Sequence, residues 1–177
     1  MSTRALLSLL VAVSVSGCAP ATTRSGSTTP PPSPTPTQSR TSCAGGGIPV
    51  DAALREPKDI RLKVTNASGT EGLALTVFVE LGRRGFQMLG TAEGTVAPVP
   101  QVAVIRFGPR TVGAAWLVKL YFDGDVTTEY DARRSDDIVE IVLGQGFTQL
   151  RTITEVNQAV AAADPPTMPP GGCVPPS

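Results

Sequence analysis

Residues 19–42 limit most strongly how this chain can fold, because nothing in them can form a core. The stretch is rich in proline, threonine and serine and has no aliphatic or aromatic residue larger than alanine. It therefore buries too little apolar surface to offset the conformational entropy lost on folding. We predict a disordered linker over residues 18–42, extended by its prolines, and a folded domain restricted to residues 43–177.

The residues before the linker have the layout of an export signal. One cation, Arg4, precedes an apolar run at residues 5–15. A helix of about eleven residues rises only about 17 Å, whereas the hydrocarbon core of a bilayer is about 30 Å thick. We therefore expect residues 1–17 to be a signal peptide rather than a permanent transmembrane helix.

A cysteine follows the apolar run in a context similar to the lipobox of bacterial lipoproteins. Residues 15–18 read Val-Ser-Gly-Cys, with two small residues before a cysteine whose thiol would take a diacylglyceryl group. The prediction is a lipid anchor at Cys18 that holds the chain to the outer face of a bacterial cell membrane, because two or three acyl chains bind stably. The alternative is cleavage near residues 19–21 and release of a soluble protein.

The other two cysteines, Cys43 and Cys173, lie on either side of the predicted domain. Once Cys18 is acylated or removed, an even pair remains in an oxidising compartment. A disulfide would join the two ends of the domain and, by loop entropy, stabilise it by about 5 kcal/mol. Two free thiols are the alternative. Two distant cysteines in a chain without histidine fall short of a zinc shell, so we expect no metal.

Periodic apolar residues predict the elements of the domain. Strands are expected at residues 60–64, 86–89, 102–107, 127–130 and 138–143. Helices are expected from Thr70, as the N-cap, to Arg84, and over residues 111–122 and 154–163. The strand–helix–strand unit occurs twice, with one extra hairpin strand. We predict an α+β two-layer sandwich, with one mixed sheet and two main helices on one face (βαββαβ-like), followed by a proline-rich tail.

Short segments of this domain carry a family resemblance. They are residues 59–69 (DIRLKVTNASG), 72–74, 81–86, 104–109 (VIRFGP), 114–115, 142–144 and Phe147. In order and spacing they resemble the LytR C-terminal domain family over residues 59–147. The resemblance implies an α+β module of the cell envelope, of the stand-alone actinobacterial envelope-integrity type. That family usually ends its last strand with Leu-Gly-x-Asp-Phe or Tyr, whereas residues 143–147 read LGQGF, so we expect no carboxylate function there.

The residue inventory argues against catalysis. The chain has no histidine, and no serine, cysteine or threonine stands in a known nucleophile context. The neighbouring carboxylates Asp123 with Asp125, and Asp136 with Asp137, lie in polar turns where solvated side chains are expected. We predict no catalytic residue, no cofactor and no enzyme. The 15 basic and 15 acidic residues cancel, so we also expect no nucleic-acid partner.

Two positions are candidates for binding. The first is the turn before the first helix, where free backbone N–H groups can hold an anion; a purely structural turn and cap is the alternative. Its residues are Asn66, Ser68, Gly69, Thr70 and Gly72. The second is Arg106 with Arg110, which flank the next strand-to-helix junction and would hold an acidic group, unless they are simply solvated. Trp116, at helical spacing, is expected in the core rather than as a sugar platform.

Together these features predict the function class. We expect a non-enzymatic cell-envelope lipoprotein that contributes to envelope integrity by binding a partner envelope protein as a scaffold. The alternative is a module that binds peptidoglycan or a wall polymer directly.

Overall fold

The computed structural model describes residues 43, 46–93 and 97–174. The predicted signal peptide, the predicted lipidation site Cys18 and the predicted linker lie outside these residues. Within the described part, no helix combines the length and the apolar character that crossing a bilayer requires.

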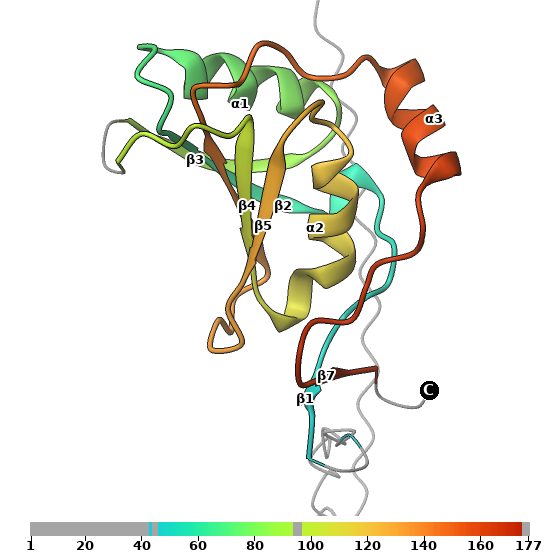
Figure 1. Ribbon diagram of the computed structural model, residues 1–177. Coiled ribbons are helices and arrows are strands. Elements are labelled where there is room, and N and C mark those ends of the chain that lie inside the picture. The colour runs from blue at the N-terminus through green and yellow to red at the C-terminus, as the bar shows by residue number, and fades with distance from the viewer. Residues whose placement is uncertain (1–42, 44–45, 94–96, 175–177) are drawn as a thin grey trace, which may run out of the picture. The chain divides into compact units, whose positions relative to one another are not determined.

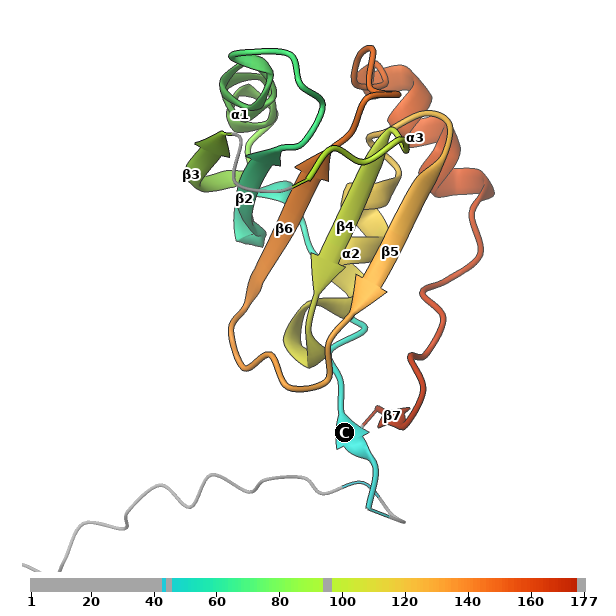
Figure 2. The same cartoon turned by 60° about the vertical axis from the view of Figure 1, so that its left-hand side comes forward.

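A five-stranded mixed sheet forms the centre of the domain. Its strands are β2 (Arg61–Asn66), β3 (Gln87–Glu93), β4 (Ala103–Phe107), β5 (Val126–Tyr130) and β6 (Ile138–Leu143). They lie in the order β3-β2-β6-β4-β5, as Figure 2 shows from left to right. Strand β2 runs parallel to both β3 and β6, and β4 runs parallel to β5 but antiparallel to β6. The predicted mixed sheet is thus confirmed.

Two helices make the crossovers between parallel neighbours. Helix α1 (Leu73–Arg83) connects β2 to β3, and α2 (Val112–Lys119), after the 3-10 turn η2 (Pro109–Thr111), connects β4 to β5 (Figure 1). Both helices contribute to one buried cluster against the sheet. Its members include Ala74, Val77, Leu81, Ala114, Ala115, Val118, Leu62, Ile105 and Ile141. Because one cluster contains both helices, they cover the same face of the sheet, as predicted.

The predicted hairpin between the last two strands is wrong. Strands β5 and β6 follow each other in the sequence, but β4 lies between them in the sheet. The side chains explain the arrangement. Val139, Ile141 and Leu143 of β6 are fully buried, which favours a central strand, whereas the Val-Thr-Thr-Glu-Tyr sequence of β5 suits an edge.

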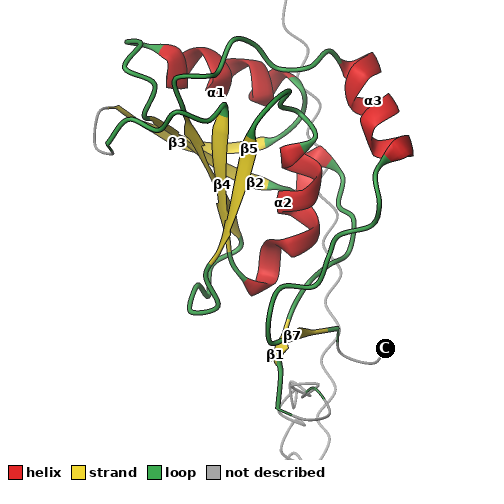
Figure 3. Cartoon of the chain, viewed as in Figure 1, coloured by secondary structure: helices red, strands yellow, loops and turns green. Residues whose placement is uncertain are grey.

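Element boundaries also differ from the prediction. Helix α1 begins after Gly72, which is its N-cap in the left-handed region, so the expected N-cap Thr70 is wrong. The second helix is shorter than predicted, and β3 continues to Glu93. Helix α3 (Ile153–Ala162) matches the prediction to within a residue, and its Thr152–Glu155 capping box shows why. Figure 3 shows α1, α2 and α3 in red and the strands in yellow.

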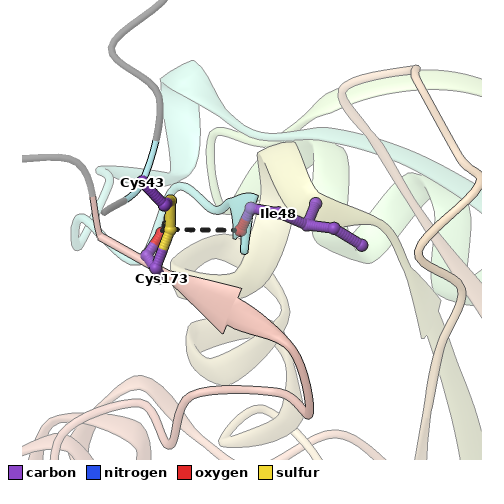
Figure 4. The surroundings of a disulfide bond; sticks show 3 residues. All are labelled: Cys43, Ile48 and Cys173. Carbon is purple, nitrogen blue, oxygen red and sulfur yellow. Dashed lines mark hydrogen bonds between the residues drawn. A yellow bond between two sulfur atoms is a disulfide. The ribbon is translucent and has the colours of Figure 1, made fainter. Parts of the chain in front are cut away.

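A clasp joins the two ends of the described domain. Strand β1 (Ile48–Pro49), which precedes the short 3-10 turn η1 (Pro57–Asp59), pairs in parallel with β7 (Gly172–Cys173). Cys43 and Cys173 form a disulfide there, with Cα atoms 6.2 Å apart. The Sγ atom of Cys173 also lies 3.7 Å from the carbonyl oxygen of Ile48 (Figure 4). The predicted disulfide is confirmed, and Figures 1 and 2 both show β1 and β7 at the end of the domain away from α1.

Candidate functional site

The turn before α1 is organised by one buried amide, Asn66, which is 5% exposed. Its Oδ1 accepts hydrogen bonds from the backbone N–H and the hydroxyl of Ser68. Its Nδ2 donates to the carbonyl oxygen of Thr70 at 2.7 Å and to Glu93 Oε2 at 2.6 Å. Gly69 and Gly72 have φ values of 83° and 74°, which other residues rarely adopt. The predicted residues therefore do come together, as a self-bonded turn.

The charge beside this turn is unfavourable to the anion that the sequence predicted. A hollow of about 410 Å³ lies against the turn, and both Glu71 and Glu93 line it. Two carboxylates repel an incoming phosphate or carboxylate. The anion site stays a prediction, and the hydrogen bonds of Asn66 account for the turn without a ligand.

The two candidate arginines lie in different surroundings. Arg106 donates from Nε to Glu129 Oε2 at 2.7 Å, across the β4–β5 pair. Arg110 is exposed and lines another hollow with Asp51 and Asp137. The structure does not bring them into one anion site. Trp116 is half-buried rather than in the core, and its indole N–H donates to the carbonyl oxygen of Asp164 at 2.8 Å, which fixes the C-terminal tail.

Three of the four carboxylates that the sequence singled out, those of Asp123, Asp136 and Asp137, contact arginines. Arg151 contacts Asp123 at 2.7 Å, and its hydrogen bond and charge lower the pKa of Asp123. Burial raises the pKa of Asp136, but hydrogen bonds from Arg134 and the Ile138 amide outweigh it, so the net shift is downward. A general acid at neutral pH needs a raised carboxyl pKa. The pKa values of Asp123 and Asp136 are lowered instead, which does not suit a general acid.

An apolar groove runs between α1 and the segment after β6. Its volume is about 600 Å³, and its walls are one side of α1 and residues 147–150. Leu75 is 56% exposed and Val79 is 41% exposed, although both are large apolar side chains. Exposed apolar side chains that gather in a groove mark an interaction surface. We call this surface the α1 groove.

One end of the α1 groove carries a net positive charge. Glu80 Oε1 is 2.9 Å from Arg84, whereas Arg83 reaches only 4.0 Å from the other oxygen of the same carboxylate. The side chain of Arg83 is 75% exposed. Glu80 is the one acidic residue among the described residues that line the groove. Two guanidinium groups therefore share one carboxylate.

Sequence reasoning missed this groove, although a signal for one wall was present. With 100° per residue, Leu75 and Val79 lie about 200° and 240° around the helix from Leu73, opposite the buried stripe that contains Val77 and Leu81. The apolar side chains of Leu75 and Val79, on the side of α1 expected to be polar, were the sequence signal for this wall of the groove. The other wall had no such sign, because its approach to α1 depends on the tertiary fold.

Comparison with known proteins places the domain in a family. The model of the family described as "LytR cell envelope-related transcriptional attenuator" matches residues 59–147. The chain belongs to the LytR C-terminal domain family. Strands β2 to β6 and helices α1 and α2 lie within the matched residues. The α1 wall of the groove therefore belongs to the family domain, and residues 148–150 follow directly after it.

Two mycobacterial proteins are similar to this LytR C-terminal domain chain. The cell envelope integrity protein Cei of Mycobacterium tuberculosis is 32% identical over 123 residues, which cover 65% of this chain and 54% of that protein. The chain thus spans about half the length of this relative. The crystallised soluble domain of a conserved hypothetical secreted protein from Mycobacterium marinum aligns with a TM-score of 0.52 and 26% identity. That alignment covers 68% of this chain and 82% of that domain.

The segment after β6, where residue 146 departs from the family pattern, packs closely against residues 99–102. Gly146 stands where the pattern has aspartate, and a Cβ there would lie 3.1 Å from the carbonyl oxygen of Pro100. At Gly144, a Cβ would overlap the carbonyl oxygen of Gln101. The backbone of residues 99–102 passes so close because it bonds to this segment, including Gln145 N–H to the oxygen of Val99 at 2.8 Å.

Proposed function

We propose that this chain is a non-enzymatic, extracytoplasmic protein of the cell envelope, anchored through Cys18, that contributes to envelope integrity by binding a partner envelope protein. The family, the similarity to an envelope integrity protein and to a secreted protein, and the export signal support the location. The α1 groove carries the binding part of the proposal, because Leu75 and Val79 expose apolar surface that a soluble domain ordinarily buries.

The described residues support binding rather than chemistry. The carboxylates of Asp123 and Asp136 have pKa values shifted away from those of a general acid, and the chain has no histidine. By contrast, the groove has the apolar floor and charged rim that protein interfaces use.

A crosslinking experiment in intact cells tests the partner. A photoreactive benzoylphenylalanine replaces Leu75 in the full chain, and the same residue replaces Leu89 as the control. Leu89 is also exposed, at 46%, but it lies on β3 and does not line the groove. We expect a discrete protein adduct from position 75 and none from position 89. Equal adducts from both positions, or none from position 75, would contradict the proposal.

The alternative function, direct binding of peptidoglycan, has its own readout. The purified full chain is sedimented with insoluble peptidoglycan. Under the proposal it stays in the supernatant. Pelleting that persists in the Leu75→Lys variant would assign the wall contact to another surface and favour the alternative.

A further inference from the structure

We infer that the α1 groove binds an extended segment of the partner, which pairs with the backbone of residues 148–150 and packs alternate apolar side chains on Leu75 and Val79. This inference rests on the proposed partner-binding function and adds the conformation and chemistry of the bound segment. Three independent features of the groove lead to it.

The first feature is an incompletely paired strand-like wall. Leu150 forms an antiparallel bridge with Phe122, and the Arg151 N–H donates to the oxygen of Tyr121 at 2.9 Å. Among the described residues, no hydrogen-bond partner exists for the backbone N–H and C=O groups of Thr148 and Leu150. Alternate residues of an extended segment direct these groups to opposite edges. One edge is used, and the unpaired groups on the other belong to the exposed Thr148 and to Leu150, which is 9% exposed. This edge offers backbone groups to an added strand.

This feature favours a strand over a helix as the occupant. A bound helix satisfies its own backbone groups and would leave those of Thr148 and Leu150 unpaired under an apolar cover. An extended peptide supplies donors and acceptors at the required spacing. Pairing of the backbone therefore selects the conformation of the bound segment.

The second feature is the spacing of the apolar side chains. Leu75 and Val79 are four positions apart in α1, a rise of about 6 Å. Residues at positions i and i+2 of a strand are about 6.6 Å apart and point to the same side. An extended segment that runs along α1 can therefore place two successive inward side chains on this pair. Its sequence should alternate between apolar and polar residues.

The third feature is charge. Arg83 and Arg84 share the single carboxylate of Glu80, and Arg83 is the more exposed of the two. A carboxylate on the partner segment would complete this cluster without displacing the Glu80–Arg84 pair. The segment should therefore carry an acidic residue beside its apolar positions, at the Arg83 end of the groove.

Three synthetic peptides test the inference with the full-length chain. The probes are an eight-residue peptide with alternating valine and threonine and a terminal glutamate, a rearranged peptide with the valines at helical spacing, and an alternating peptide that ends in lysine. We expect the alternating acidic peptide to bind about tenfold more tightly than the helical one. We also expect the Leu75→Lys variant to weaken it about tenfold, while the matched Leu89→Lys variant leaves it unchanged.

Two further readouts follow the backbone and the charge. Amide exchange at Thr148 and Leu150, observed by NMR, should slow at least tenfold when the peptide binds. The Arg83→Glu variant should bind the acidic peptide about threefold more weakly and prefer the lysine-terminated one, as expected for an exposed ion pair.

Several results would overturn the inference. They are binding of the helical peptide as tight as that of the alternating one, unchanged exchange at Thr148 and Leu150, and failure of every peptide to bind. Sedimentation of the chain as a dimer that Leu75→Lys dissociates would instead make a second copy the occupant. An adduct at position 75 in cells combined with failed peptides would leave the proposed function standing. Peptide binding without any cellular adduct would support the groove's preference for an extended segment and contradict the proposed partner in cells.

Discussion

At the scale of single residues, a polar side chain that the sequence presented as a ligand-binding candidate turns out to hold the turn together. Asn66 bonds to Ser68, Thr70 and Glu93 from a nearly buried position. Gly69 and Gly72 give the same turn its positive φ angles, which glycine readily adopts. The contact with Glu93 was not predictable, because it depends on β3 extending four residues past its expected end.

Replacement of Asn66 by alanine tests this structural role. The change removes hydrogen bonds in a site that excludes water, so we expect the free energy of unfolding to fall by about 2 kcal/mol. Urea denaturation followed by circular dichroism measures it. The Ser68→Ala variant, which removes only one hydroxyl of the same network, should lose about 1 kcal/mol or less. Equal stability of the Asn66→Ala variant and the wild type would show that the network contributes nothing.

At the scale of elements, periodicity predicted which segments are strands and helices, but not which strands are neighbours. The apolar runs at β4 and β6 and the alternating run at β2 were recognisable because burial on one or both faces imposes a sequence pattern. The position of β6 between β2 and β4 was not, because it follows from two crossovers that place β3 and β5 on opposite edges. The α1 groove depends on this same arrangement.

Two helical glycines give a matched prediction with opposite signs. A Cβ at Gly113 in α2 would overlap the carbonyl oxygen of Ala53, whereas a Cβ at Gly82 in α1 would meet only Met88 Cγ at 3.4 Å. We expect Gly113→Ala to lower the free energy of unfolding by about 1–3 kcal/mol through overpacking. Gly82→Ala should raise it by about 0.5–1 kcal/mol through helix propensity. Thermal or urea unfolding of both variants compares them, and shifts of the same sign would refute the close approach at Gly113.

At the scale of the whole molecule, stability should be nearly independent of pH around neutrality and should decline in acid. Asp123, Asp131, Asp136 and Glu155 have lowered pKa values, from ordinary values of 3.8 for aspartate and 4.5 for glutamate. Their contribution is therefore complete above the ordinary range and is lost as pH falls through the folded-state values. Without histidine, we expect a nearly constant free energy of unfolding from about pH 5.5 to 8 and a decline below about pH 4.

The acid decline can be assigned with a single variant. Asp136→Asn removes one of the four groups, so its unfolding free energy should fall less steeply below about pH 4 than that of the wild type. Urea titrations at a series of pH values measure both. A transition near neutral pH, or an identical acid slope in the variant, would contradict the assignment.

The disulfide gives a second prediction for the whole molecule. It closes a loop with a sequence separation of 130, so reduction or the double variant Cys43→Ser with Cys173→Ser should lower the free energy of unfolding by up to about 5 kcal/mol. The midpoint in urea should shift equally for the reduced wild type and for the double variant. Reductant should then have no effect on the variant itself. An unchanged midpoint would mean that the clasp contributes nothing to stability.

The clasp also determines how the domain withstands being pulled. A force applied at Cys43 divides between two routes, one through β1 and η1 into β2, the other through the disulfide and the tail into α3. Neither the central sheet nor α3 then has to bear the whole tension. The hydrogen bond from Trp116 to the carbonyl oxygen of Asp164 holds the tail close to the end of α3, where the second route reaches that helix. A partner that pulls on the α1 groove, at the other end of the domain, would thus load a domain held at two points of the chain rather than peel away a single strand.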